Sequence, residues 1–272
     1  RENYDRFRGR LMFPIRDARG RVVAFGGRIL GDGQPKYLNS PDTPLFDKGR
    51  MLYNLDRAGP VARKSGRLIV VEGYMDVIAL AQAGISEAVA PLGTALTEQQ
   101  LQLLWRVAPE PLLCFDGDAA GQRAGLRAAL RALPMLEPGR SLRFVTLPPG
   151  QDPDYLVRAG GAAAFDALAM KAEPLIDRLW RSETDGVELQ TPERRAALRE
   201  RLRELARSIQ HRDVSELYQQ AFRERLDALF APPPRASAAP QGRFSGRGGR
   251  GQPFVPMQAI PRTRALSAQG ST

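Results

Sequence analysis

The sequence has 272 residues, of which 43% are hydrophobic, enough for one large or two ordinary domains with a buried core. No apolar run reaches the roughly 20 residues of a membrane span, and the first ten residues lack the apolar core of a signal peptide, so we expect a cytoplasmic protein without a membrane partner. The single cysteine, Cys114, and the single histidine, His211, exclude a disulfide and a Cys/His zinc site within this chain. Catalysis would therefore depend on carboxylates, basic side chains or a bound ion.

The charge is unevenly distributed along the chain. Residues 1–64 carry 14 Lys or Arg against 7 Asp or Glu, residues 65–232 carry 20 against 23, and residues 233–272 carry six Arg and no acid. A basic front next to an acidic middle suggests a polyanionic partner such as nucleic acid, although basic faces can also be merely solvated.

The front of the chain, residues 1–65, predicts a mixed lobe rich in strands. The apolar runs LMFPI and RVVAFGG flank the turn RDARG, which is the pattern of a β-hairpin with Gly20 at the turn. The next stretch, PKYLNSPDTPLFDKGRMLYNL, contains too many Pro, Asn and Ser residues for a long helix.

From Leu68 onward, apolar strands alternate with helices. Strands are predicted at LIVVEG, EAVAP, PLLCFD and LRFVTL, separated by helices at residues 75–83, 97–107 and 119–133, with Thr97 as a cap of the second helix. This order predicts a parallel sheet with helices on both faces. In such sheets, ligands bind beyond the carboxyl ends of the strands.

Carboxylates occur at these strand ends. Glu72 ends the first strand, Asp116 and Asp118 follow the third, and Asp152 and Asp154 follow the fourth. Side chains two positions apart in a strand share a face, so the D-G-D pair would repel unless a metal ion, a shared proton or solvent compensates. An ordinary turn, in which the glycine has a positive φ, is the alternative for D-G-D alone. The acids at the other strand ends favour one shared site.

The rest of the chain divides into two parts. Residues 156–231 are predicted to be helical, with a helix start at Thr191 and an apolar stripe of Leu198, Leu202 and Leu205 that we expect to pack in a core. Residues 232–272 are rich in Pro, Gly, Ser and Arg, which predicts a disordered linker.

Several motifs in order resemble known families. VVEGYMDVIAL, FDGDAAG and QDPDYL together resemble the Toprim domain, and FRGRLMFPIRDARGRVVAFGGR with PKYLNSPDTPLFDKGRMLYNL is similar to the catalytic core of bacterial DnaG-type primases. The resemblance covers residues 1–231, and the ordered set is specific whereas a single D-G-D is not. It implies an α/β fold with a Rossmann-like Toprim domain at residues 66–155, flanked by the mixed α+β lobe of residues 1–65 and a helical bundle at residues 156–231.

The resemblance also implies an activity: DNA replication through RNA primer synthesis on single-stranded DNA, from ribonucleoside triphosphates, by a nucleotidyltransferase that uses Mg²⁺ or Mn²⁺. By matching motif, Glu72, Asp116 and Asp118 would be the catalytic, metal-binding acids. The acids around them would be Asp76, Asp152 and Asp154. For Asp76, the alternative is a first-turn acid that interacts with the helix dipole.

The same resemblance implies a nucleic-acid and nucleotide surface in the front lobe. Its residues would be Arg28, Lys36, Tyr37, Asn39 and Lys48. Arg supplies bidentate phosphate contacts, Lys a point charge, and Tyr a stacking face or a hydroxyl. Arg16, Arg19 and Arg21, near the hairpin turn, are expected to be solvated.

The sequence also departs from a full-length primase. It contains neither the zinc-binding domain that begins such proteins nor the helicase-binding domain that ends them, so we expect a fragment with a monomeric core, whose helicase contact would lie in the missing C-terminal domain. Two other classes stay open. In a haloacid-dehalogenase-type phosphatase, Asp116 would be the nucleophile and Asp118 the acid/base, but that family places the pair after its first core strand and gives Glu72 no role. A non-catalytic nucleic-acid-binding module, or another Toprim-type phosphotransfer enzyme, is the second alternative.

Overall fold

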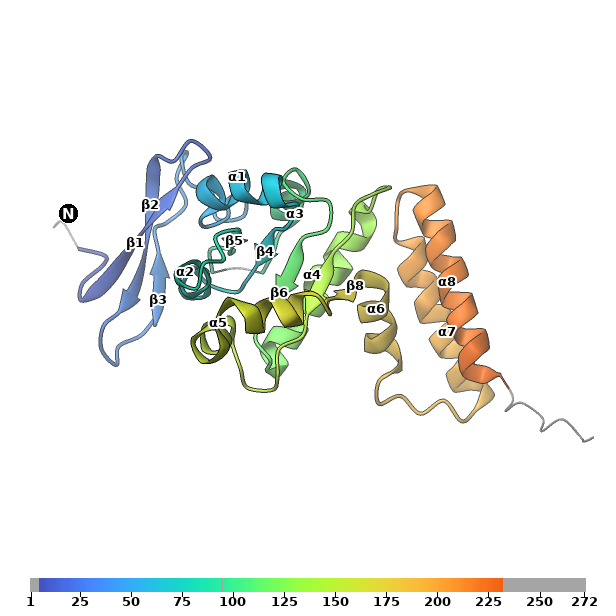
Figure 1. Cartoon of the computed structure of the whole chain (residues 1–272). Coiled ribbons are helices and arrows are strands. Elements are labelled where there is room, and N and C mark those ends of the chain that lie inside the picture. Colours follow the sequence, from blue (N-terminus) through green and yellow to red (C-terminus); the bar gives the residue numbers. More distant parts are fainter. Residues whose placement is uncertain (1–4, 94, 232–272) are drawn as a thin grey trace, which may run out of the picture. The chain divides into compact units, whose positions relative to one another are not determined.

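A computed structural model describes residues 5–93 and 95–231 of the chain (Figure 1). The predicted linker, residues 232–272, lies outside the described residues. Among the helices described, none combines the length and the apolar character that crossing a membrane requires.

The front of the chain forms a three-stranded antiparallel sheet in the order β1-β2-β3. β1 (Arg10–Arg16) and β2 (Val22–Ile29) form the predicted hairpin, and Gly20 in its turn has a φ of 79°. β3 (Tyr37–Asn39) pairs with the second half of β2. The sheet carries several of the predicted nucleotide-binding residues on its second and third strands.

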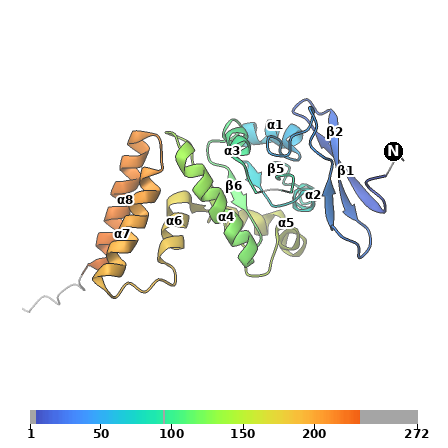
Figure 2. The ribbon, with the colours of Figure 1, turned by 180° about the vertical axis from the view of Figure 1, so that it is seen from behind.

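The second sheet has five short strands in the order β5-β4-β6-β7-β8 (Figures 1 and 2). These are β4 (Ile69–Val70), β5 (Ala88–Val89), β6 (Leu112–Cys114), β7 (Arg143–Val145) and β8 (Glu173–Pro174). The first four are parallel, as the alternation of strands and helices predicted. β8 is an antiparallel edge strand that the sequence analysis missed, because two residues are too few to interrupt a helical pattern.

Eight α-helices are described. They are α1 (Leu55–Ser65), α2 (Tyr74–Gln82), α3 (Glu98–Trp105), α4 (Ala119–Ala132), α5 (Pro153–Ala169), α6 (Leu175–Thr184), α7 (Pro192–Arg207) and α8 (Arg212–Phe230), and a short 3₁₀ turn, Leu133–Met135, follows α4. The sequence analysis missed α1, whose pattern contains Pro60. β8 also interrupts the stretch of residues 156–231 that was predicted to be helical.

The predicted cap of α3 is confirmed and ties this helix to the front of the chain. Thr97 Oγ1 accepts a hydrogen bond from Gln100 N (3.1 Å), and Gln100 Oε1 accepts one from Thr97 N (3.0 Å). The buried Gln100 amide then donates to the backbone oxygens of Lys48 and Met51, at 2.9 and 2.8 Å. One side chain therefore satisfies a helix end and two carbonyls of an irregular segment.

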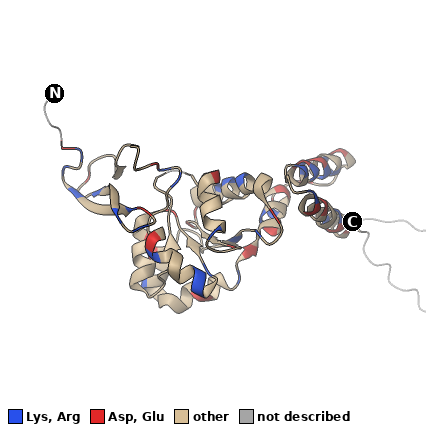
Figure 3. Cartoon of the chain, turned by 90° about the horizontal axis from the view of Figure 1, so that it is seen from above, with Lys and Arg blue, Asp and Glu red and all other residues tan. Residues whose placement is uncertain are grey.

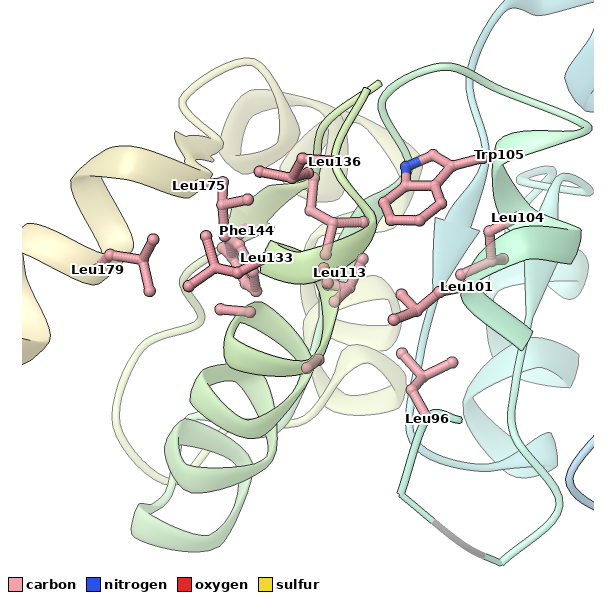
Figure 4. Close-up of a cluster of buried hydrophobic side chains, with 14 of the residues drawn as sticks. Leu96, Leu101, Leu104, Trp105, Leu113, Leu133, Leu136, Phe144, Leu175 and Leu179 are labelled. Carbon is pink, nitrogen blue, oxygen red and sulfur yellow. The ribbon is translucent and has the colours of Figure 1, made fainter. Parts of the chain in front are cut away.

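Both faces of the five-stranded sheet are buried. Val70, Leu113 and Phe144 belong to a core that contains residues of α1, α3, α4 and α6, which Figure 4 shows in part. On the other face, Ile69 and the fully buried Cys114 belong to a core with residues of α2 and α5. Alternate residues of the four parallel strands thus enter opposite cores, which holds the ends of these strands in fixed positions.

The helical hairpin of α7 and α8 adds to the first of these cores. Leu198 and Leu202 of the predicted apolar stripe are buried, and Leu205 is partly buried against the same cluster. The prediction that this stripe packs in a core is confirmed.

Candidate active site

The strand-end acids meet because β4 and β6 are neighbours in the sheet. Glu72 lies two residues beyond β4, and Asp116 lies two residues beyond β6. Glu72 Oε1 accepts a hydrogen bond from the backbone N–H of Asp116 at 3.0 Å, although 44 residues separate the two. This bond joins the two strand ends and places the carboxylate of Glu72 next to the backbone of Asp116.

Two glycines allow backbone segments to pack closely around Asp116: Gly117 faces residues 148–151, and Gly121 faces the backbone of Asp116 itself. A Cβ atom on Gly117 would lie 2.1 Å from the carbonyl oxygen of Pro148, and one on Gly121 would lie 2.2 Å from the carbonyl oxygen of Asp116. The N–H of Gly117 donates to Gln151 O at 2.9 Å. Gly117 is not among the glycines with positive φ, so the expected reason for this glycine in a D-G-D turn is wrong. Glycine is required at this position because a side chain would clash with the backbone of Pro148, and not because the backbone is left-handed.

Two of the predicted acids cap helices. Asp118 is exposed, and its Oδ1 accepts hydrogen bonds from Ala120 N and Gly121 N at the start of α4, both at 2.8 Å. Asp152 Oδ1 accepts from Tyr155 N at 2.6 Å at the start of α5. Each cap occupies one carboxylate oxygen and directs a helix N-terminus, with its partial positive charge, toward the acids.

Asp76 joins this group from the first turn of α2. Its Oδ2 accepts a hydrogen bond from Gly73 N at 3.1 Å, and its place in the first turn is the one that the helix-dipole alternative describes. Burial, together with the negative charges of Asp116, Asp152 and Glu72, raises the pKa of Asp76 to about 7. The capping contact and the acidic site are therefore compatible for this residue.

Asp116 has a carboxylate oxygen that the protein leaves unsatisfied. Burial, followed by the charges of Glu72, Asp152 and Asp118, raises its pKa to about 6. Its Oδ1 atom is buried and has no hydrogen-bond partner in the protein. A buried carboxylate oxygen without a partner is costly, so this atom of a cavity-lining residue is available to bind a ligand.

A basic and aromatic wall from the front sheet faces the acids. Tyr37 lies near two cations: the guanidinium of Arg28 is 5.8 Å, and the ammonium of Lys36 is 6.0 Å, from the centre of its ring. Asn39 is held by a hydrogen bond from its Nδ2 to Leu92 O at 2.9 Å. Figure 3 shows Lys and Arg residues on the strands of this sheet.

Tyr74 connects the two walls, and the sequence analysis missed it. Its ring centre lies 5.4 Å from that of Tyr37, 4.8 Å from that of Phe13 and 5.5 Å from that of Tyr53. Burial raises the pKa of Tyr74 to about 12, and its hydroxyl has no hydrogen-bond partner. Its position between Glu72 and Asp76 in VVEGYMD was the available signal.

A cavity of about 410 Å³ lies between these walls. Nine of the predicted residues line it, namely Arg28, Lys36, Tyr37, Asn39, Glu72, Asp76, Asp116, Asp152 and Asp154. Two do not: Asp118 caps α4, and Lys48 lies with its Nζ 3.7 Å from Asp42 Oδ2. A larger cavity of about 650 Å³, near Arg67 and Arg143, lies at the amino ends of the strands, away from the acids.

The predicted residues near the hairpin turn are engaged with their own loop. Arg16 donates to Gly20 O at 2.8 Å and is part-buried, so the expectation that it is solvated is wrong. Arg21 is exposed and forms an ion pair with Asp17 at 2.6 Å, and Arg19 is exposed. None of these three arginines lines the cavity between the acids and the front sheet.

The carboxylates can be tested for their fit to a divalent cation. Within residues 5–93 and 95–231, no three His, Cys, Asp or Glu side chains form a preassembled metal-binding group. Mg²⁺ commonly uses only one or two protein carboxylates and fills its other positions with waters and substrate phosphates. The unpartnered oxygen of Asp116 next to Glu72 fits this mode of binding.

Comparisons with known proteins agree with this geometry. The Toprim domain family matches residues 66–146, which contain the parallel strands with Glu72 and Asp116 at their ends. The fold and the site therefore define a Toprim-domain protein. The family described as "DNA primase catalytic core, N-terminal domain" matches residues 1–59.

Similar proteins make the assignment specific. The chain is 52% identical to a DNA primase of Neisseria meningitidis serogroup A and 55% identical to one of Escherichia coli, and each match covers 72% of this chain. A solved structure described as the DnaG primase catalytic domain bound to ssDNA is 49% identical, with a TM-score of 0.75, over 81% of this chain and 71% of that chain. The chain belongs to the family of DnaG-type primase catalytic cores, and the resemblance is confirmed. It spans about a third of the length of the two curated relatives (33% and 34%).

Proposed function

We propose that the chain catalyses the DNA-templated joining of ribonucleotides into short RNA primers. The observation that carries the proposal is the meeting of acids and basic or aromatic side chains from two sheets around one cavity. Acids suit metal-assisted phosphoryl transfer, and the opposite wall suits phosphates and bases. The proposal assigns the front lobe to residues 1–65, the Toprim domain to residues 66–155 and the helical subdomain to residues 156–231.

In the proposed reaction, the 3′-hydroxyl oxygen of the growing strand forms a bond to the α-phosphorus of a ribonucleoside triphosphate. The bond from that phosphorus to pyrophosphate breaks, and the hydroxyl proton leaves. Mg²⁺ or Mn²⁺, when bound, would lower the pKa of the hydroxyl and neutralise charge on the leaving group. Glu72 and Asp116 would hold the ion, with Asp118 at the adjacent helix cap and Asp76, Asp152 and Asp154 around it.

The basic and aromatic wall would hold substrate and template. Arg28 and Lys36 are placed to contact phosphates, and the exposed ring of Tyr37 offers a stacking face between them. A relative with 49% identity is described as bound to single-stranded DNA, which supports the same class of partner for this chain. We extend the proposal to action in the cytoplasm at a replication fork, with a helicase partner bound through a separate domain.

Incorporation of labelled ribonucleotides on a single-stranded DNA template tests the proposal. We expect RNA products of short length with Mg²⁺ or Mn²⁺ and none after chelation. Asp116→Asn and Glu72→Gln should nearly abolish incorporation while the melting temperature stays that of a folded protein. Hydrolysis of a phosphomonoester without incorporation would favour the phosphatase alternative, and DNA binding without any metal-dependent product would favour a binding module.

A further inference from the structure

A second cavity, of about 370 Å³, lies between α4 and α6. Three arginines line it: Arg123 on α4, and Arg178 and Arg181 on α6. α4 and α6 lie side by side in both views of the ribbon (Figures 1 and 2), and no part of this cavity belongs to the acidic site. Its position matters because α4 begins at the acid pair.

Arg178 is buried without a carboxylate partner. The residue is only 8% exposed, and its Nη2 donates to Gln122 O at 2.9 Å. Its guanidinium also lies 5.8 Å from the ring centre of Phe144, and Gly125 leaves room for it on α4. Among the residues that the structure describes, no acid lies within ion-pair distance of this guanidinium. A backbone carbonyl and an aromatic face are therefore its partners in the protein.

The other charges around the cavity neutralise Arg178 only in part. The carboxylate of Glu173 is taken by Arg181, at 2.6 Å. Asp185 is exposed at the rim, and Arg123 is exposed with no ion-pair partner in the described part of the chain. Burial, followed by the charge of Arg181, lowers the pKa of Arg178, and the negative charge of Glu173 opposes this shift. The buried guanidinium is thus the excess positive charge, and buried charges are normally paired.

We propose that the cavity between α4 and α6 binds a phosphate group of the nucleic-acid strand that extends from the acidic site. A guanidinium fork matches the geometry of a phosphate. The carbonyl of Gln122 and the ring of Phe144 do not satisfy all the donors of this fork or neutralise its charge. The identity of the strand rests on the proposed function, whereas the anion site rests on the arginines alone.

The distance along α4 suits this role. Asp118 caps the helix and Arg123 follows five residues later, which at 1.5 Å per residue is about 7.5 Å along the axis. A strand rises by roughly 3.4 Å per nucleotide, so a strand that ends at the acids would reach the cavity within about two or three nucleotides. The site would hold the strand in register at a point that the front sheet does not reach.

Binding of a fluorescent single-stranded DNA, measured over a salt titration with the metal chelated, tests the proposal. Arg123→Ala should lower the log-log salt slope by about 0.7, which corresponds to about fivefold weaker binding at 0.1 M salt. Arg127→Ala is the matched control, because Arg127 is an exposed arginine one turn further along α4 that does not line the cavity. Arg178→Lys keeps the charge but removes the fork, so it should weaken binding relative to Arg127→Ala at a temperature at which a melting curve shows both variants folded.

The outcomes separate the two proposals. If wild type binds DNA and both Arg123→Ala and Arg178→Lys match Arg127→Ala, the phosphate site is refuted and the proposed function stands. An equal loss in all three variants also refutes it, because the effect is then a diffuse one of charge. If Arg123→Ala weakens the binding of inorganic pyrophosphate but leaves DNA binding equal to that of Arg127→Ala, the cavity takes a free anion rather than a strand. Absence of DNA binding by wild type overturns both proposals.

Discussion

Replacing Gly117 with alanine should damage the acidic site from a position that contributes no functional group. The added Cβ would lie 2.1 Å from Pro148 O and 3.2 Å from Gln151 O, and both of these are backbone atoms that cannot rotate away. Real Cβ atoms stay at least 3.0 Å from such neighbours, so the segment that precedes α5 must move by about 0.9 Å. The same movement strains the hydrogen bond from Gly117 N to Gln151 O.

The size of the effect follows from these contacts. Overpacking of this kind costs about 1–3 kcal/mol, and a chain of this size loses about 2–4 °C of melting temperature per kcal/mol. We therefore expect a decrease of about 2 to 12 °C. Because the moved segment carries Asp152 and Asp154 beside Asp116, ribonucleotide incorporation should fall about 100-fold, the cost of a misplacement near 1 Å.

Thermal melting and incorporation at saturating Mg²⁺ should be measured on the same preparation. Gly31→Ala is the control, because a Cβ at Gly31 would meet nothing within 4 Å and this glycine is not among those with positive φ. The control should match wild type in both assays. If Gly117→Ala matches it too, close backbone approach does not position the acids, and our account of the D-G-D sequence is wrong.

Three further predictions concern the acids, the cations and the aromatic cluster. Without metal, the pKa of Asp116 in the folded state is about 6 against an ordinary 3.8, so the charged carboxylate destabilises the fold fully above about pH 6 and not at all below about pH 4. Asp116→Asn should therefore raise the melting temperature at pH 8 but not at pH 4. Equal changes at both pH values would contradict this. Lys36→Ala should lower the log-log salt slope of DNA binding by about 0.7. Lys48→Ala should lower this slope less, because the ammonium of Lys48 lies near Asp42 and outside the cavity. The reverse order would place the template elsewhere. Tyr74→Phe removes a buried hydroxyl without a partner and should leave the free energy of unfolding unchanged or raise it by about 1 kcal/mol in urea denaturation, whereas Tyr74→Ala should lower it by about 3–5 kcal/mol.

Much of the architecture could be predicted because its causes are local. Alternating apolar runs and helical patterns indicated the parallel strands, and Thr97 marked the start of α3. Short elements were missed for the same reason. β8 has two residues, and α1 contains a proline, so neither has a strong local pattern.

The sequence by itself determined the order of the four parallel strands and the helices between them, and the placement of acids at the ends of these strands, since both depend on residues that are neighbours along the chain. Only the tertiary structure decided which acids share a cavity, because Glu72 meets Asp116 across 44 residues and Arg178 meets Gln122 across 56. Only the tertiary structure shows that position 117 must be glycine, because the backbone of Pro148 lies too close for a side chain and this contact cannot be predicted from the local sequence. Such distances are set by how strands and helices pack, and packing joins parts of the chain that no short stretch of sequence contains.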